Sequence, residues 1–484
     1  MAVSLMIQGT MSNVGKSLIT AGLCRVFMQD GYSVSPFKSQ NMALNSYVTH
    51  DFLEMGRAQA VQAISAGKEP DVRMNPVLLK PINDQGSEVI VMGDPVSVMK
   101  AKDYFLYKKS LTPVIKKAYE SLASENDIIV IEGAGSPVEL NLKKDDIVNM
   151  GLAEMTDAKV LLVGDVDRGG VFAQLLGTLD LLLPDERARV FGLIVNKLRG
   201  DASLFKDAVR IIEEKGNVPV LGVLPYIDID IEGEDSLSDL PERGREASDT
   251  ALDIAVIRTG RLSNYTDIYP FLSIERVSVR FIESPDEIGN ADLIIIPGSR
   301  NTIGDLRRLK EKGFSKALTE YSKKKPVIGI CGGLQMLGVS VSDPEGVEEG
   351  GEEEGFSLLP IKTVLTKEKK KSKIKGVFPK LSGAFKSLSE KEFEGYEIHA
   401  GRSFDVSDGN ETTSIQRGNV FGTYIHGFLD RGSLALDFSN DLSKGPVLKG
   451  MNYYDFREAQ IDTLSDMIRE NLDISAIYRS LGVK

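Results

Sequence analysis

A cysteine set among glycines is the residue whose neighbours most clearly indicate chemistry. Residues 327–338 read VIGICGGLQMLG, an apolar strand pattern that ends at Cys331 and passes at once into a helical pattern. The glycines allow a tight strand-turn-helix elbow, which lifts one side chain clear of a sheet. The lifted side chain is a thiol, and the start of the next helix favours its thiolate. The sequence therefore predicts a cysteine nucleophile.

A thiol nucleophile needs a base and an oxyanion hole. The chain has three histidines, and two of them, His399 and His426, lie in strand patterns downstream of Cys331. Either could serve as the base, and His399 could instead orient a substrate or support a domain interface. We expect the oxyanion hole to be formed by backbone N–H groups of three residues beside strand ends: Gly298, Ser299 and Gly332.

Residues near the start of the chain are typical of phosphate binding. Residues 9–17, GTMSNVGKS, follow an apolar strand pattern and precede a helical one. Backbone N–H groups of such a loop point at phosphate oxygens, Lys16 neutralises their charge, and the Ser17 hydroxyl can ligate Mg²⁺. The expected nucleotide-binding residues are Gly9, Thr10, Ser12, Asn13, Val14, Gly15, Lys16 and Ser17, together with Asn196 at a later strand end.

Further polar residues follow other strand patterns. Glu132 ends one of them, at the sheet edge where ligands bind in open α/β folds, and is a candidate Mg²⁺ ligand beside Ser17. Glu139 could add charge or contact a substrate amide, or be an ordinary surface carboxylate. The expected substrate residues are Gln40, Asn41, Asn45 and Glu139. The three amides would suit a substrate rich in carboxylates and amides, and could equally be capping and loop residues.

Two blocks of alternating strands and helices must position these groups. In the first block, the apolar runs are continuous rather than alternating, which favours strands buried on both faces of a parallel sheet. The strands expected there are 5–8, 34–37, 128–131, 160–163, 193–195 and 220–223, and those of the second block include 252–257, 293–296 and 327–330. The sequence thus predicts an α/β protein, with a phosphate-loop parallel-sheet domain followed by a second α/β domain.

The length of 484 residues calls for more than one domain. We expect domains at 1–230 and 251–435, a linker at 231–250 where composition turns acidic, and a helical C-terminal segment at 436–484. Residues 343–354 are acidic and a lysine-rich run follows at 367–375, which we interpret as a mobile charged loop and a solvated face.

Composition limits the partners and the compartment. The net charge of −12 argues against nucleic acid and anionic membranes as partners. No apolar run reaches membrane-spanning length, and residues 2–9 are better explained as a buried strand than as a signal peptide. The two cysteines, Cys24 and Cys331, exclude a disulfide framework and favour a reducing cytoplasm. The oligomeric state stays open, a homo-oligomer included.

The motifs of both halves together resemble the cobyric acid synthase family of glutamine amidotransferases, which act in cobalamin biosynthesis. The resemblance rests on residues 9–17, 40–46, 56–59, 75–81, 132–140, 297–306, 331–338, 395–401 and 422–427. It implies a dethiobiotin-synthetase-like first domain, whose phosphate loop has the same long spacing, and a class I glutamine amidotransferase-like second domain. It also favours His426 over His399 as the base. The Glu usual two residues after this histidine is replaced by Phe428, as in members of the family, so a Cys–His dyad is expected.

The resemblance implies a reaction as well as a fold. The substrate would be adenosylcobyrinic acid a,c-diamide, amidated at its b, d, e and g carboxylates, with ATP, Mg²⁺ and L-glutamine as the other participants. ATP would convert each carboxylate to an acyl phosphate, a much better electrophile, and ammonia released from glutamine would displace the phosphate. Internal passage would keep the ammonia neutral, which favours a tunnel between the domains.

Three alternatives compete with this interpretation. Cobyrinic acid a,c-diamide synthase shares the domains and the chemistry but amidates other carboxylates; residues 40–46 and 297–302 favour cobyric acid synthase. A partitioning-type regulatory ATPase would carry a second lysine early in the loop, where this chain has Thr10 and Met11. The third is an inactive amidotransferase-like binding module, suggested by the absent acid.

Overall fold

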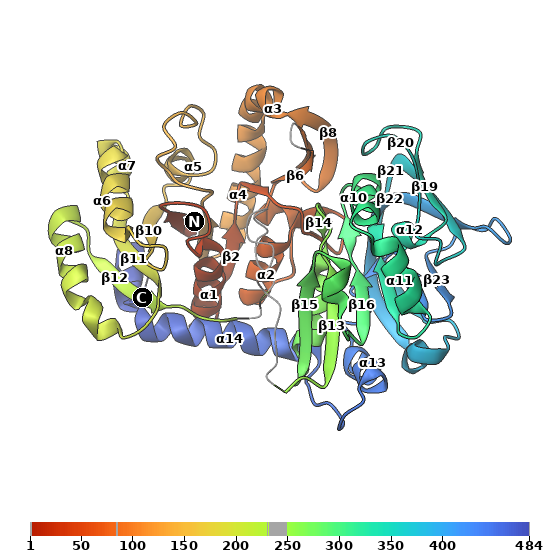
Figure 1. Cartoon of the computed structure of the whole chain (residues 1–484). Coiled ribbons are helices and arrows are strands. Elements are labelled where there is room, and N and C mark those ends of the chain that lie inside the picture. The colour runs from red at the N-terminus through yellow and green to blue at the C-terminus, as the bar shows by residue number, and fades with distance from the viewer. Residues whose placement is uncertain (1, 84–85, 230, 232–248, 484) are drawn as a thin grey trace. The chain divides into compact units, whose positions relative to one another are not determined.

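Two sheets of parallel strands, one in each half of the chain, organise the fold (Figure 1). The computed structural model describes residues 2–83, 86–229, 231 and 249–483. Its contacts divide the chain into two units. The first unit consists of Met1–Ala43, Leu53–Ser236 and Glu458–Lys484, and the second of Leu44–Phe52 and Leu237–Arg457.

The first unit is built on a six-stranded sheet in the order β12-β11-β10-β1-β9-β2, with every neighbouring pair parallel. The strands are β1 (Val3–Gly9), β2 (Val34–Phe37), β9 (Ile128–Glu132), β10 (Lys159–Asp165), β11 (Val190–Leu198) and β12 (Val220–Pro225). All six coincide with the apolar runs expected to be strands, and most interior residues of the four central ones are buried. The predicted parallel sheet is confirmed.

Helices and a smaller sheet surround this core. The helices are α1 (Lys16–Gln29), α2 (Arg57–Ser65), α3 (Ala101–Tyr107), α4 (Thr112–Glu125), α5 (Met150–Met155), α6 (Val171–Leu181), α7 (Pro184–Arg187) and α8 (Lys206–Gly216). The smaller sheet has the order β3-β6-β7-β8, formed by β3 (Gln40–Met42), β6 (Val77–Asn83), β7 (Gly86–Val91) and β8 (Asp94–Lys100). Among the described residues, no helix combines the length and apolarity needed to cross a membrane.

The second unit has its own six-stranded sheet, in the order β15-β13-β16-β18-β24-β23, in which only β23 runs antiparallel to its neighbour. The strands are β13 (Leu252–Ile257), β15 (Val277–Ile282), β16 (Leu293–Ile296), β18 (Val327–Ile330), β23 (Ser414–Arg417) and β24 (Val420–Thr423). Its helices include α9 (Tyr269–Leu272), α10 (Thr302–Glu311), α11 (Phe314–Ser322), α12 (Gly332–Leu337) and α13 (Leu434–Leu442). The predicted second α/β domain is confirmed.

The charged stretch of the second unit is not the mobile loop expected from its composition. A five-stranded sheet, β20-β19-β21-β22-β25, contains β19 (Ser340–Asp343), β20 (Gly351–Glu354), β21 (Ile361–Val377), β22 (Glu392–Asp405) and β25 (Ile425–His426). The turn between β19 and β20 is ordered because the Asp343 carboxylate accepts hydrogen bonds from the N–H groups of Val347, Glu348 and Gly350. The lysine-rich run forms part of β21, since strand pairing tolerates lysine on an exposed face.

The C-terminal helices do not form the separate segment that we expected. Helix α14 (Tyr453–Asn471) spans the boundary at Arg457, and α15 (Ile474–Leu481) belongs wholly to the first unit. The reason is apolar packing: Ile468, Leu472 and Ile477 are buried in the core beneath β1 and α1. The expected linker, 231–250, lies outside the described residues except at 231, 249 and 250.

Helix α14 should stabilise the first unit through Ile468. This side chain is fully buried, and Gly22 of α1 makes room for it: a Cβ at Gly22 would lie 2.3 Å from the Ile468 Cδ1. We expect Ile468→Ala to lower the free energy of unfolding by about 2–4 kcal/mol, because it leaves a cavity. The exposed Glu470→Ala is the control, with an expected effect within about 0.5 kcal/mol. Hydrogen exchange of the α1 amides measures the loss of stability in each variant. Equal protection of these amides in Ile468→Ala and Glu470→Ala would contradict the packing role of Ile468.

Candidate active sites

The phosphate-binding loop joins β1 to α1, where the sequence placed it. Its turn needs two residues with left-handed backbone, Asn13 at φ 62° and Gly15 at φ 99°. Gly15 also lies against the Asn196 side chain, so close that a Cβ would be 2.2 Å from the Asn196 amide nitrogen. The amide of Asn196 donates to the backbone oxygen of Val14 at 2.7 Å. Asn196, near the end of β11, therefore stabilises the loop. Its expected contact with adenine stays a prediction.

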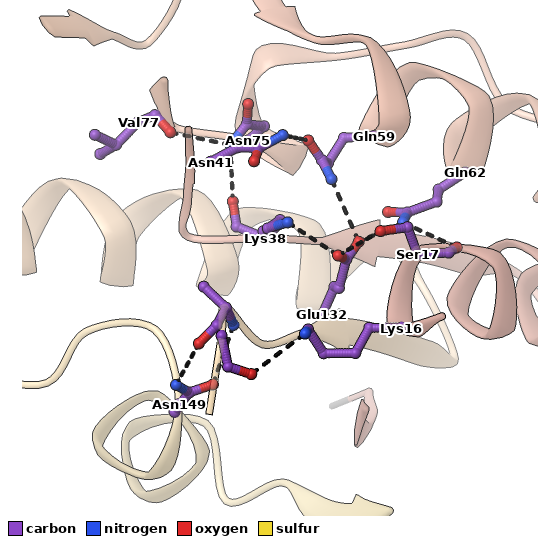
Figure 2. A network of polar contacts seen from close by, with 12 residues as sticks. Lys16, Ser17, Lys38, Asn41, Gln59, Gln62, Asn75, Val77, Glu132 and Asn149 are labelled. Carbon is purple, nitrogen blue, oxygen red and sulfur yellow. Dashed lines mark hydrogen bonds and ion pairs between the residues drawn. The ribbon is translucent and has the colours of Figure 1, made fainter. Parts of the chain in front are cut away.

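Lys16 folds over the loop that it follows. Its ammonium donates to the backbone oxygen of Met11 at 3.0 Å and to that of Gly135 at 3.2 Å (Figure 2). Gly135 lies in the loop after β9, which Asn149 holds through hydrogen bonds with Ala134. The lysine thus links the phosphate loop to the neighbouring strand end, and its expected role in neutralising phosphate stays a prediction.

The remaining residues of the loop differ in exposure. Thr10 is anchored by its hydroxyl, which donates to Gln174 at 3.1 Å, and by its N–H, which donates to Val163. Val14 is buried under the turn, whereas Ser12 is exposed at its tip. A Cβ at Gly9 would lie 2.5 Å from the Val14 side chain, so only glycine fits at the end of β1.

Glu132 is the centre of a buried polar network at the end of β9. Figure 2 shows side chains from several elements converging on its carboxylate. The Ser17 hydroxyl donates to Oε1 at 2.8 Å, the Lys38 ammonium to Oε1 at 2.9 Å, and the Gln62 amide to Oε2 at 2.6 Å. Gln59 lies 3.4 Å from Oε2 and accepts a hydrogen bond from Asn41 at 2.8 Å. The network connects the phosphate loop with β3.

The charge of Glu132 is preserved by these partners. Burial raises the pKa of a carboxyl group, but Lys38 and the hydrogen bonds from Gln62 and Ser17 outweigh it and lower the pKa of Glu132. A carboxylate oxygen and a serine hydroxyl 2.8 Å apart are the oxygen donors that Mg²⁺ prefers, so Ser17 and Glu132 could both contact one ion. No cluster of three His, Cys, Asp or Glu side chains occurs among the described residues, so a metal here would draw its other ligands from phosphate and water.

The four expected substrate residues are not gathered in one place. Asn41 is buried in the Glu132 network, and Gln40, also on β3, accepts a hydrogen bond from the Tyr104 hydroxyl at 2.5 Å. Asn45 is buried in the segment Leu44–Phe52, which belongs to the second unit. Glu139 is exposed in the loop after β9. Their roles stay predictions.

Cys331 occupies the elbow between β18 and α12. Its backbone has φ 53° and ψ −108°, a strained conformation for a residue with a Cβ. The surrounding glycines make the turn possible by close backbone contact. A Cβ at Gly333 would lie 1.9 Å from the Ile296 oxygen, and one at Gly329 would lie 2.6 Å from the Gly333 oxygen. The strand-turn-helix elbow predicted from the sequence is present.

His426 reaches the thiol from β25 and is held by a residue that sequence reasoning missed. Its Nδ1 lies 2.7 Å from Oδ2 of Asp267, and Oδ1 of Asp267 accepts the Gly427 N–H at 2.6 Å. The expected dyad therefore has a carboxylate partner after all, supplied 159 residues earlier in the chain. The available signal was weak: Asp267 is a lone acid in the run YTDIYPFL.

The aromatic residue at the usual position of the acid belongs to the core instead. Phe428 is 1% exposed and packs edge-on against Phe378 and Phe421. A carboxylate at this position would be buried among aromatic rings, so the orienting acid has to come from another element.

The environment of His426 favours its protonated form. Burial alone would lower its pKa, but the charge of Asp267 and the hydrogen bonds to Asp267 and Cys331 raise the pKa of His426 to about 10. The Nε2 atom has no nitrogen or oxygen partner among the described residues, and its hydrogen-bond partner is the Cys331 sulfur. The ring can thus hold a proton at Nε2 beside the Cys331 sulfur, the position from which a histidine assists a cysteine nucleophile.

The backbone of the expected oxyanion hole meets at this thiol. Gly298 and Ser299 form β17 (Gly298–Ser299), paired with β14 (Leu262–Ser263). A Cβ at Gly332 would lie 2.8 Å from the Ser299 nitrogen, and one at Gly298 would lie 3.7 Å from the His426 ring. The Ser299 hydroxyl donates to Asp305 at 2.6 Å and thereby fixes the turn. These contacts bring Gly298, Ser299 and Gly332 together, and their role as donors stays a prediction.

The arrangement of His426 can be tested by titration, because the chain contains only three histidines. Carbon-13 NMR of the imidazoles should show His426 protonated through pH 8. Asp267→Asn removes the charge that stabilises the imidazolium, so the pKa of His426 should fall toward or below its ordinary 6.5. The control variant His50→Gln identifies which NMR signal comes from the exposed His50 ring. An unchanged His426 titration in Asp267→Asn would contradict the orienting role of Asp267.

Comparison with known proteins shows the same two-part organisation. A family model of the CobB/CobQ-like glutamine amidotransferase domain matches residues 253–434, and that of an AAA domain matches residues 3–231.

Relatives match along almost the whole chain. Cobyric acid synthase of Ruminiclostridium cellulolyticum is 51% identical, over 99% of this chain and 97% of its own length. That of Lachnoclostridium phytofermentans is 48% identical over 99% of both chains, and that of Photorhabdus laumondii is 46% identical over 99% and 98%. On this similarity, and with the phosphate loop and the cysteine elbow in place, the chain belongs to the cobyric acid synthase family.

Proposed function

We propose that this protein amidates the b, d, e and g carboxylates of adenosylcobyrinic acid a,c-diamide, using ATP and L-glutamine. The observation that carries the proposal is the coexistence, in one chain similar to cobyric acid synthases throughout, of a phosphate loop and a Cys–His site. A reducing cytoplasm suits a free thiol at Cys331.

In the second unit, the thiolate of Cys331 attacks the side-chain amide carbon of glutamine. His426 donates its proton from Nε2 to the leaving nitrogen, so that ammonia departs and a thioester remains; it then takes a proton from the water that hydrolyses the thioester. Asp267 keeps the ring in the orientation in which Nε2 faces the sulfur. Backbone N–H groups of Ser299 and Gly332 stabilise the oxyanion.

In the first unit, the residues around the loop position ATP and the carboxylate to be activated. Lys16 neutralises phosphate oxygens, and backbone N–H groups of the loop bind them. Mg²⁺ would be held by Ser17 and Glu132 and would supply further charge neutralisation when bound. The activated carboxylate then accepts ammonia, and phosphate leaves. Asn41, Gln59 and Gln62 connect this site with β3, where the amides of a corrinoid could be recognised.

Product analysis distinguishes this reaction from that of the related diamide synthases. With the a,c-diamide, ATP and glutamine, we expect four carboxyl-to-amide conversions by mass spectrometry. Cobyrinic acid without amides should be a poor substrate. Conversion of cobyrinic acid to its a,c-diamide, with no reaction of the a,c-diamide itself, would favour cobyrinic acid a,c-diamide synthase. ATP hydrolysis without any amidation would favour a regulatory ATPase.

The two half-reactions should be separable by mutation. Cys331→Ala removes the nucleophile, so glutamine-dependent amidation should fall by at least about 10³-fold, while amidation supplied with ammonium chloride should persist. Lys16→Ala should have the opposite effect: loss of amidation from either nitrogen source, with glutamine hydrolysis retained. Lys102→Ala, an exposed lysine far along the chain from the loop, is the matched control. Glutaminase activity that survives Cys331→Ala would exclude the assigned nucleophile.

A further inference from the structure

Strand β22 carries two polar residues that the proposed reaction does not use. Glu397 and His399 are two residues apart and so lie on one face of the strand. Their side chains are 0% and 3% exposed. One oxygen of Glu397, Oε2, accepts from the Lys370 ammonium at 2.7 Å and from the Ser372 hydroxyl at 3.2 Å.

The other polar atoms of this pair are left as hydrogen-bond acceptors. Glu397 Oε1 and His399 Nε2 are buried and have no partner among the described residues. The Nδ1 of His399 lies 2.7 Å from the Gly401 oxygen, which can only accept, so Nδ1 carries the proton and Nε2 presents a lone pair. Burial lowers the pKa of His399 to about 4, which keeps the ring neutral. Two buried acceptors without hydrogen bonds lower the stability of the folded protein unless a ligand supplies donors.

The strand that carries these acceptors passes close to the thiol. The backbone oxygen of Ile398, the residue between them, is 3.9 Å from the Cys331 sulfur. The His399 ring stacks on Tyr424 with centroids 3.8 Å apart, and the Tyr424 hydroxyl accepts from Gln335 of α12 at 3.1 Å. On the same strand, Tyr396 stacks on the His426 ring at 5.2 Å. Strand β22 therefore passes the nucleophile, with Tyr396 on one of its faces and the Glu397–His399 pair on the other.

We propose that Glu397 Oε1 and His399 Nε2 bind an ammonium group next to Cys331. Such a group carries several N–H donors and one positive charge, which match two acceptors of which one is a carboxylate oxygen. His399 Nε2 lies 4.0 Å from Oε2 of Glu397, so the two side chains are neighbours, and Oε1 is the other oxygen of the same carboxylate. The inference rests on the proposed glutaminase reaction. That reaction offers two sources of the ligand: the α-ammonium of glutamine, and the ammonia released from its side-chain amide after it takes the proton of the carboxylic acid that hydrolysis of the thioester forms.

Glu397→Gln, in the full chain, tests the site. Binding is measured by calorimetry in a Cys331→Ala background, with L-glutamine and with glutaramate, which lacks the α-amino group. Coupling is measured in the active enzyme as amides formed per glutamine hydrolysed. Glu394→Gln is the matched control, a carboxylate on the same strand that is 37% exposed and pairs with Lys375 and Arg431. His399→Phe keeps the stacking on Tyr424 and removes the second acceptor.

If the site takes the α-ammonium, Glu397→Gln should weaken glutamine binding about 10- to 100-fold and leave glutaramate binding unchanged. If it takes released ammonium, both affinities should persist while coupling falls, and His399→Phe should lower coupling in the same way. The inference is overturned if Glu397→Gln and His399→Phe both match Glu394→Gln in affinity and coupling. That result would mean that water, and not an ammonium group, binds the two acceptors. A Cys331→Ala protein that binds no glutamine, with a wild-type chain that hydrolyses none, would instead overturn the proposed function.

Discussion

Each unit depends on one buried carboxylate that has to keep its charge. Glu132 in the first unit is 1% exposed and Asp267 in the second is 5% exposed. Removing an ionised carboxylate from water costs several kcal/mol unless cations and hydrogen-bond donors replace the lost hydration. The donors are therefore arranged around these two residues: Ser17, Lys38 and Gln62 around Glu132, and His426 with the Gly427 N–H around Asp267.

This requirement explains which elements meet at each site. Glu132 draws its donors from the start of α1, the end of β2 and the middle of α2, so it joins the phosphate loop to the neighbouring strand and helix. Asp267 joins the turn after β14 to the end of β25. In both cases the carboxylate that draws these elements together is also one that the proposed chemistry uses, as the proposed Mg²⁺ ligand in one unit and as the proposed orienting acid in the other.

The elbow at Cys331 illustrates a different kind of dependence. Its strained backbone persists because the neighbouring backbone segments leave no room for any side chain at Gly329 and Gly333. The apolar core beneath it is aromatic where related amidotransferases carry an acid, and Phe428 completes that core. Packing and catalysis are thus divided between different residues: Phe428 fills the core, and Asp267 provides the carboxylate.

The sequence by itself determined what depends on short-range patterns. Continuous apolar runs identified the six strands of the first large sheet and several of the second, and glycine spacing identified the phosphate loop and the cysteine elbow, because these features need only neighbouring residues. The motifs also led to the correct family. Only the tertiary structure decided which distant side chains share a site. Asp267 beside His426, Lys38 and Gln62 on Glu132, and the return of α14 to the first unit all join residues far apart in the chain. Such pairings depend on which buried charges and apolar faces come into contact when the chain folds. The local spacing of residues does not contain that information.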